Sequence, residues 1–368
     1  MHYDVIIVGA GMFGSVFAAE ACEQGLSVLV IDKRNHIGGF CDSYIDQETG
    51  IDVHRYGTHA FHTNDDRVWT WVNRYARFYP YRHRVMITTA DDRVFEMPVN
   101  LETLERFHGR RLKPSEAAHL VCRPTDPMAD FVTTAKALVG QEIYEALIRG
   151  YTQKHWGCDP ALLPGSVIKR LPVRTSYRSG YFNDRYQGVP EDGYHAMFER
   201  MLSRADVQLG TAVTPDLIDN LRSRCRVLVW TGALDEFYGC DEGRLGWRSV
   251  KIVTEVLPED DHQGCTQMNF ADPSVPWTRK HEPKHMRPDR ACRGTVVQTE
   301  YPGDDPADPA YPMRRAEDLA LCERYQQRSR QERNVIFGGR LAHYVYYDMH
   351  QVVASALRAF GQLGGVDV

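Results

Sequence analysis

Three glycines near the start of the chain have the spacing that holds a phosphate group close to the backbone. Gly9, Gly11 and Gly14 follow a short apolar run in the pattern Gly-x-Gly-x-x-Gly. Gly9 permits a tight turn, Gly11 lets the backbone approach a pyrophosphate, and Gly14 lets the following helix pack on the strand. That helix presents unpaired N–H groups to the phosphates, and Asp32, which ends the next apolar run, can accept hydrogen bonds from a ribose diol. Together these features predict a bound adenine dinucleotide.

After this first strand-helix-strand unit, the chain departs from the pattern of a nicotinamide dehydrogenase. Such an enzyme continues directly with further βαβ units, whereas here the pair Gly38-Gly39 leads through a polar stretch to the segment 51–63. This departure favours a flavin over NAD. An amphipathic helix is expected at 65–78, and a hairpin is expected around 84–97.

The end of the chain returns to alternating helix and strand, at 315–330, 335–339 and 349–362. We therefore predict an α/β fold with a discontinuous FAD-binding Rossmann-type domain, an inserted helical domain and an inserted antiparallel β-sheet domain. The expected boundaries are 1–78, 193–235 and 315–368 for the FAD-binding domain, 99–185 for the helical domain with a mobile loop at about 164–180, and 79–98 with 236–314 for the sheet domain.

Composition narrows the choice of compartment and partner. A formal net charge of −5 gives no reason to expect nucleic acid or an anionic membrane as a partner. Nine scattered cysteines without a C-x-x-C pair predict reduced thiols rather than disulfides or a zinc site. We expect no signal peptide, because the first strand starts at residue 3, and no apolar run approaches the roughly 20 residues that span a bilayer. The sequence therefore predicts a soluble cytoplasmic enzyme.

Eight longer motifs occur in order along the chain and point to one family. They are Lys33-Arg-Asn-His-Ile-Gly-Gly39, Tyr56-Gly-Thr-His-Ala-Phe-His-Thr-Asn64, Gly150-Tyr-Thr-Gln-Lys-His-Trp-Gly157, Ile168-Lys-Arg-Leu-Pro-Val-Arg174, Tyr181-Phe-Asn-Asp-Arg-Tyr-Gln-Gly188, Val275-Pro-Trp-Thr-Arg279, Glu300-Tyr-Pro302 and Gly338-Gly-Arg-Leu-Ala-His-Tyr-Val-Tyr-Tyr-Asp-Met-His-Gln351. Read together, they resemble the bacterial UDP-galactopyranose mutases over nearly the whole chain.

The resemblance implies an isomerase that uses a flavin without net redox change. Enzymes of this family interconvert the pyranose and furanose forms of UDP-galactose. Their FAD must be reduced, because its N5 attacks the anomeric carbon, displaces the nucleoside diphosphate and forms a covalent flavin–sugar adduct. The resemblance therefore also implies a nucleotide-sugar substrate, an electron donor that reduces the flavin, and a homodimer.

The resemblance assigns residues to each part of this reaction. Arg170 and Arg279 match the family's two diphosphate-binding arginines, and a planar guanidinium can bind phosphate through two hydrogen bonds. The other residues with an implied catalytic role are His59, His62, Tyr311, Arg340 and Tyr346. The residues implied in substrate binding are Tyr151, Trp156, Arg174, Tyr181, Asp348, His83 and Glu300. The expected cofactor contacts are Gly9, Gly11, Phe13, Gly14, Asp32, Lys33, Gly39, Phe40, Thr231, Gly232, Gly339, Arg340 and Met349.

No metal site is expected. His59 and His62 lie three residues apart, but no third ligand is patterned near them in the sequence.

The departures from the family pattern gather around the sugar and the loop. Ala60 replaces a bulkier apolar residue, and His83 stands where family members carry an Asn that lines the sugar pocket. These changes leave the reaction intact and open the choice of substrate. The alternatives are a 6-deoxy or amino sugar on the same or another nucleotide, and an FAD-dependent oxidoreductase.

Overall fold

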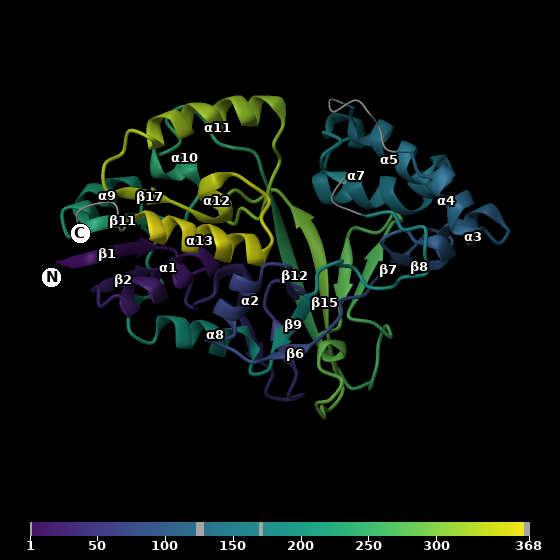
Figure 1. Cartoon of the computed structure of the whole chain (residues 1–368), viewed down its shortest axis with the longest axis horizontal. Coiled ribbons are helices and arrows are strands. Elements are labelled where there is room, and N and C mark those ends of the chain that lie inside the picture. The colour runs from purple at the N-terminus through teal and green to yellow at the C-terminus, as the bar shows by residue number, and fades with distance from the viewer. Residues whose placement is uncertain (1, 123–128, 169–171, 364–368) are drawn as a thin grey trace.

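The computed structural model describes residues 2–122, 129–168 and 172–363. A parallel five-stranded sheet forms the nucleotide-binding part, in the order β10-β2-β1-β11-β17. Both ends of the chain lie in this part (Figure 1). The strands are β1 (Tyr3–Val8), β2 (Val28–Ile31), β10 (Asp206–Gln208), β11 (Cys225–Trp230) and β17 (Val335–Phe337).

Helices cover both faces of this sheet because its strands are apolar on both sides. Ile7 of β1 faces one side, where it joins the core made with α1 (Met12–Glu23), α8 (Gly193–Leu202) and α13 (Met349–Leu363). Its neighbour Ile6 faces the other side, towards α9 and α10. The helices on that side are α9 (Pro215–Arg222), α10 (Leu234–Phe237), α11 (Ala316–Ser329) and α12 (Gly339–His343).

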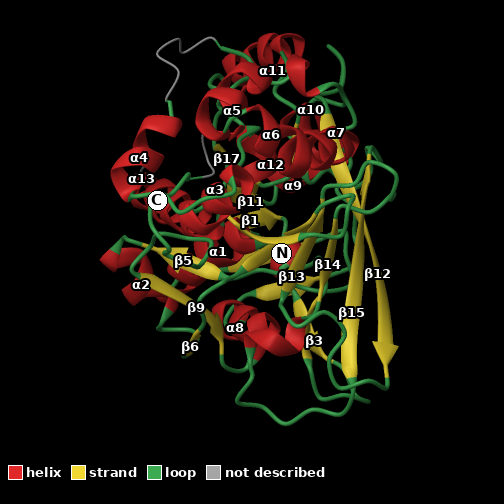
Figure 2. Ribbon diagram, turned by 90° about the vertical axis from the view of Figure 1, so that its right-hand side faces the viewer, coloured by secondary structure: helices red, strands yellow, loops and turns green. Residues whose placement is uncertain are grey.

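A seven-stranded sheet forms the second part, in the order β16-β12-β15-β14-β13-β7-β8. All its pairs are antiparallel except β7 with β13, which is parallel. Figure 2 shows β12 and β15 as two long strands at one side of the molecule. The strands are β7 (Val85–Thr88), β8 (Val94–Met97), β12 (Trp247–Leu257), β13 (Gln267–Phe270), β14 (Arg279–His281), β15 (Thr295–Gly303) and β16 (Tyr311–Pro312), and the short helix η5 (Pro283–Met286) follows β14.

Helices from the middle of the chain pack against β7 and β8 through a shared apolar core. They lie at one end of the molecule in Figure 1. They are α3 (Leu101–His108), α4 (Pro114–Leu120), α5 (Phe131–Val139), α6 (Gln141–Ile143), the π-helix η2 (Tyr144–Arg149), α7 (Gly150–Trp156) and η3 (Pro160–Leu162). The described parts of the predicted loop, 164–168 and 172–180, contain no strand and no α-helix.

Two small sheets join these parts. β9 pairs with both β5 and β6, so the chain leaving the helical part returns to the nucleotide-binding part. The helix predicted at 65–78 is shorter than expected, because α2 ends at Val72 and residues 78–80 pair with β9. The elements are η1 (Gly39–Cys41), β3 (Ser43–Ile45), β4 (Asp52–His54), β5 (Phe61–Thr63), α2 (Asp66–Val72), β6 (Phe78–Pro80) and β9 (Tyr186–Pro190).

We propose the three-domain division given above as the description of these parts. Among the helices of the described residues, none is both long enough and apolar enough to cross a bilayer.

Candidate active site

A cavity of about 1160 Å³ extends from the parallel sheet to the helical part. The carboxyl ends of β1, β2 and β11 form one wall, and the seven-stranded sheet and α7 form another. Open parallel sheets bind ligands at this edge, in the crevice where the connections after two neighbouring strands leave to opposite faces of the sheet.

The glycine-rich turn fits a pyrophosphate. Gly9 has φ of +111°, and a Cβ there would lie 1.9 Å from Thr231 Oγ1. A Cβ on Gly14 would lie 2.0 Å from the Gly9 carbonyl oxygen, so α1 could not sit so close to β1 with any larger residue. The first turn of α1 has no side-chain cap, and its residues Met12 and Phe13 line the cavity. Its N–H groups are therefore open to an anion.

Asp32 is held in place at the end of β2. Its two carboxylate oxygens accept hydrogen bonds from the backbone N–H of Ala10 at 2.7 Å and of Arg34 at 2.8 Å. The residue is buried and lines the cavity. It therefore stands at the end of β2, where the sequence predicts a contact with a ribose.

A clasp, made of Lys33 and Arg34 with Ala307 and Asp308, crosses the cavity beside Asp32. Arg34 pairs with Asp308 at 2.5 Å, and Lys33 Nζ donates to the Ala307 carbonyl at 2.7 Å. Arg34 also lies over the ring of Phe40, at 4.9 Å from its centroid. The clasp joins the nucleotide-binding part to the loop between β15 and β16.

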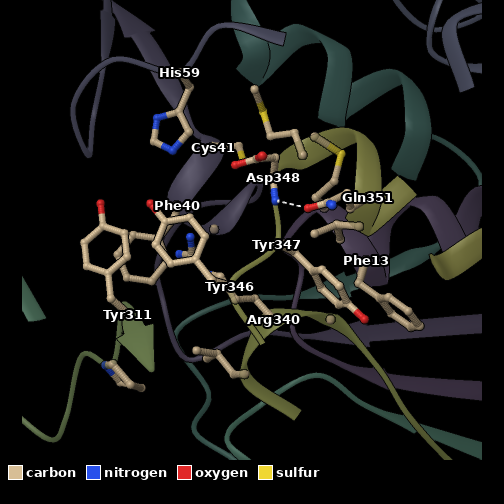
Figure 3. Close-up of a pocket in the computed structure, with 18 of the residues that line it drawn as sticks. Phe13, Phe40, Cys41, His59, Tyr311, Arg340, Tyr346, Tyr347, Asp348 and Gln351 are labelled. Carbon is tan, nitrogen blue, oxygen red and sulfur yellow. Dashed lines mark hydrogen bonds between the residues drawn. The ribbon is translucent and has the colours of Figure 1, made fainter. Parts of the chain in front are cut away.

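Aromatic rings surround Arg340 at the start of α12 (Figure 3). Its guanidinium carbon lies 5.3 Å from the Phe40 ring centroid and 5.7 Å from that of Tyr311. The rings of Tyr311 and Tyr346 stack with centroids 5.4 Å apart. Burial, followed by the neighbouring Tyr346, raises the pKa of Tyr311 to about 12, so its hydroxyl stays protonated and can donate a hydrogen bond.

Arg279, on β14, lies opposite Glu300, on β15, in the register of the sheet. Arg279 Nη1 is 3.2 Å from Glu300 Oε2, and Arg279 Nε donates to the hydroxyl of Tyr151 at 2.7 Å. Burial favours the neutral acid, but Arg279 and a hydrogen bond from His281 outweigh it and hold the pKa of Glu300 well below its usual range. The cavity wall thus contains a guanidinium that is fixed on one side and open on the other.

Two histidines in the wall, His59 and His83, are neutral at physiological pH. Burial lowers the pKa of His59 to about 4 and the pKa of His83 to about 3. His83 is held by the Tyr81 hydroxyl, 3.0 Å from its Nδ1. The ring of His62 stacks on Phe182 with centroids 3.6 Å apart.

Most of the predicted site residues line this cavity. They are Gly9, Gly11, Phe13, Asp32, Lys33, Gly39, Phe40, His59, His62, His83, Tyr151, Trp156, Tyr181, Thr231, Gly232, Arg279, Tyr311, Gly339, Arg340, Tyr346, Asp348 and Met349.

Among the described residues, three of the predicted ones do not line it. Gly14 acts through packing, and Glu300 lies behind Arg279 rather than on the wall. Arg174 does not line it either, and its guanidinium donates to the carbonyls of Gly180 and Tyr181; its contact with the substrate stays a prediction. Arg174 thus holds the described part of its own loop. Arg170 lies outside the described residues.

Sequence reasoning missed several polar residues of the wall, including the buried His155, Gln267 and Asn269. His155 stacks on Tyr151 at 5.8 Å, and burial lowers its pKa to about 3. Gln267 and Asn269 occupy alternate positions of β13 and are joined by a 2.9 Å hydrogen bond. The period of two along this strand was the signal that could have found the last two.

The fold and the cavity define a Rossmann-type dinucleotide-binding protein with an inserted ligand-binding part. Residues 7–75 match the model of the NAD(P)-binding Rossmann-like domain, and residues 146–346 match the UDP-galactopyranose mutase model. The chain belongs to the UDP-galactopyranose mutase family.

Individual relatives cover nearly the whole chain. It is 38% identical to the probable UDP-galactopyranose mutase of Klebsiella pneumoniae, over 96% of this chain and 93% of that protein. It is 36% identical to the dTDP-fucopyranose mutase of Escherichia coli, over 96% of each. The crystal structure of a reduced UDP-galactopyranose mutase superposes with a TM-score of 0.75 over 100% of this chain and 96% of that one, at 14% identity, which establishes the shared fold.

Proposed function

We propose that the protein interconverts the pyranose and furanose forms of UDP-galactose, on reduced FAD and without net redox change. The observation that carries this proposal is Arg279 in the cavity wall, which Glu300 holds from behind so that its guanidinium can meet a diphosphate. Membership of the UDP-galactopyranose mutase family supports the same reaction.

The residues around Arg279 suit a leaving diphosphate. Negative charge grows on the diphosphate as its bond to the sugar breaks, and a cation in place beforehand stabilises that charge. Tyr311 adds a hydroxyl donor, and Tyr151 together with Glu300 holds the guanidinium of Arg279 in place. We propose Arg170 as the second diphosphate ligand and Tyr181 and Tyr346 as further hydroxyl contacts.

The flavin, when bound and reduced, supplies the nucleophile for the anomeric carbon. Its pyrophosphate would lie on the α1 N-terminus and its ribose on Asp32. Arg340, Phe40 and the neutral His59 would surround its ring end. The need for reduced flavin makes an electron donor a partner of the protein.

The first test is turnover of the dithionite-reduced protein with UDP-galactofuranose under anaerobic conditions, followed by chromatography. We expect conversion to UDP-galactopyranose, because the six-membered ring dominates at equilibrium, and we expect none with oxidised flavin. Consumption of substrate electrons in proportion to product would instead identify an oxidoreductase.

A 6-deoxy sugar on dTDP is the second candidate substrate. The 36% identical relative named as a dTDP-fucopyranose mutase favours it, and His83, in the wall, is the residue that we propose to select the sugar. The wall formed by β7, β8 and η2 is also apolar, with Val85, Ile87, Met97 and Leu147. Such a surface would accept the methyl group of thymine. The same assay with dTDP-fucofuranose separates the two substrates.

We also propose that the protein is a cytoplasmic homodimer. Its nine cysteines are free thiols, which suits a reducing compartment. Sedimentation velocity tests the dimer directly.

A further inference from the structure

The long strand β12 leaves most of one edge without a partner strand. One edge pairs with β15 from Ser249 to Leu257. On the opposite edge, β16 pairs only with Trp247 and Arg248, and no other strand of the described residues follows it. Figure 2 shows β12 as the outermost strand on its side of the molecule. The free edge therefore offers a row of main-chain groups to a further strand.

A hydrogen bond beside β16 shows which residues face the free edge. The Ala310 N–H donates to the Arg248 carbonyl at 2.9 Å, so the main-chain groups of Arg248 point away from β15. Successive residues of a strand direct these groups to opposite neighbours, and the register with β15 has no break that would change this order. The residues whose N–H and carbonyl groups face the free edge are therefore Val250, Ile252, Thr254 and Val256.

This part of β12 carries exposed valines and two opposite charges. Val253 is 38% exposed and Val256 is 42% exposed. Lys251 and Glu255 are exposed as well. Charges on an edge strand usually discourage pairing, because like charges meet across the new strand pair. Here a positive and a negative residue stand at equal distances on the two sides of Val253, which makes the strand complementary to a second copy of itself.

Only one symmetric register of two antiparallel β12 strands uses this complementarity. Both faces of the sheet continue into the second copy when one residue faces its own copy, because paired side chains must lie on the same face. With Val253 in that position, Lys251 faces Glu255 of the second copy. Moving the centre by one residue leaves both charges without an opposite partner, and moving it by two sets two like charges face to face.

We propose that two copies of the protein associate through β12, with Val253 of each copy beside the two-fold axis and the two seven-stranded sheets joined into one. Val250 then pairs with Val256 of the second copy, and Ile252 pairs with Thr254. All main-chain groups that face the free edge find partners in this pairing. They form about eight hydrogen bonds, which is within the usual range for a protein interface.

Side chains add to these main-chain bonds. Lys251 of each copy meets Glu255 of the other, which places an ion pair on each side of the axis. The two Val253 side chains lie next to each other in a non-hydrogen-bonded pair, whose Cα atoms are about 4.5 Å apart. Association also covers valine surface that is exposed in the single chain, and burial of apolar surface favours association.

A dimer joined through β12 deepens the homodimer proposed above and rests on that proposal. It does not depend on the mutase reaction, because no residue of β12 lines the cavity. Turnover and association can therefore fail separately. A dimer that forms through another surface would leave the homodimer standing and remove β12 from it.

The first test is sedimentation velocity over a range of protein concentrations, which gives the dissociation constant of the dimer. Lys251→Glu replaces both ion pairs by repulsion, and we expect it to raise that constant at least about tenfold. The double variant Lys251→Glu and Glu255→Lys restores opposite charges, and its constant should return to within about threefold of the wild type. Lys113→Glu, the same change at an exposed lysine before α4, should leave the constant unchanged.

The second test is a disulfide across the axis. The Cα separation expected for two Val253 residues lies within the range of about 4.4–6.8 Å that a disulfide spans. Oxidation of Val253→Cys with diamide should therefore join two chains by a bond that dithiothreitol cleaves. Val207→Cys, at a 40% exposed position of the edge strand β10, should give no such product. The wild type, oxidised in parallel, controls for its nine native cysteines.

Flavin content and melting temperature establish that each variant is folded, and turnover of the wild type is measured separately. Four results would each overturn the proposal: a monomeric wild type, wild-type-like association in Lys251→Glu, no recovery in the double variant, or no cross-link in Val253→Cys.

Discussion

Replacing Glu300 by Gln tests how much the ion pair between Arg279 and Glu300 stabilises the folded protein. The substitution keeps the shape and the hydrogen bond from the Thr278 hydroxyl to Glu300 Oε1 at 3.1 Å, and it removes the charge that faces Arg279. At 3.2 Å and an effective permittivity of about 20, the pair attracts with about 5 kcal/mol. A neutral Gln avoids the desolvation cost of a buried carboxylate, and this gain offsets part of the lost attraction. We expect the free energy of unfolding to fall by about 3 kcal/mol at pH 7, because a buried guanidinium loses its counter-ion.

Urea unfolding of Glu300→Gln, Arg279→Gln and the double variant measures this effect. Because the double variant removes both charges, it should be more stable than the sum of the two single losses by about 3 kcal/mol. Circular dichroism and retained flavin serve as controls for the fold. A loss below 1 kcal/mol in Glu300→Gln, or additive losses in the double variant, would refute the reasoning.

The pH dependence gives a second signature of the same pair. The pKa of Glu300 in the folded state lies below its unfolded value of about 4.3. The ionised carboxylate therefore contributes fully to the free energy of unfolding well above pH 4.3, and this contribution falls as the pH drops from 4.3 towards the folded pKa. The difference in free energy of unfolding between wild type and Glu300→Gln should therefore be smaller at pH 4 than at pH 7 by about 0.6 kcal/mol.

Four further outcomes are expected. Arg279→Gln should retain flavin and lower kcat about 10²- to 10³-fold in the reduced-enzyme assay, the range for losing one charge-stabilising group; unchanged kcat would contradict its role at the diphosphate. His83→Asn should change the ratio of kcat/KM between UDP-galactofuranose and dTDP-fucofuranose, and an unchanged ratio would remove His83 from substrate selection. Because burial lowers the pKa of His83 and His155, unfolding takes up protons, so stability should fall as the pH drops below about 6.5 towards the folded pKa values. The slope, read from urea midpoints, should be shallower by about 1.4 kcal/mol per pH unit in His155→Gln. Arg34→Ala should open the clasp and speed FAD release about fivefold, as measured by flavin fluorescence, and Asp308→Ala should add little to it because both remove the same contact.

Most of the nucleotide-binding part could be predicted from the sequence. A short apolar strand, three glycines and an acid after the next strand are local features, and the structure places Gly9, Gly14 and Asp32 as their spacing predicts. Local periodicity also located the hairpin of β7 and β8 and the helices α11 and α13. It overestimated the helix at 65–78, because pairing of residues 78–80 with β9 is a contact across more than 100 residues.

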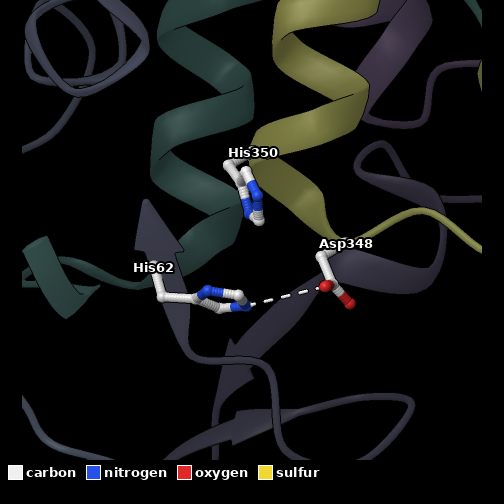
Figure 4. A group of neighbouring side chains, drawn as sticks. All are labelled: His62, Asp348 and His350. Atoms are coloured by element: carbon white, nitrogen blue, oxygen red, sulfur yellow. Dashed lines mark ion pairs between the residues drawn. The ribbon is translucent and has the colours of Figure 1, made fainter. Parts of the chain in front are cut away.

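The tertiary structure decided which side chains act together. The register of β14 on β15 places Glu300 behind Arg279, and no local pattern reports that register. Arg174 donates to the backbone carbonyl of Gly180, a contact that its sequence motif does not indicate. His62 lies beside Asp348, which precedes α13, and His350, which is on α13 (Figure 4), and no local pattern in the sequence indicates this proximity. Local spacing determines the turns, helices and strands that individual residues adopt, whereas burial and cross-strand contacts decide the charge, partner and direction of a side chain, and these exist only after distant segments have packed together.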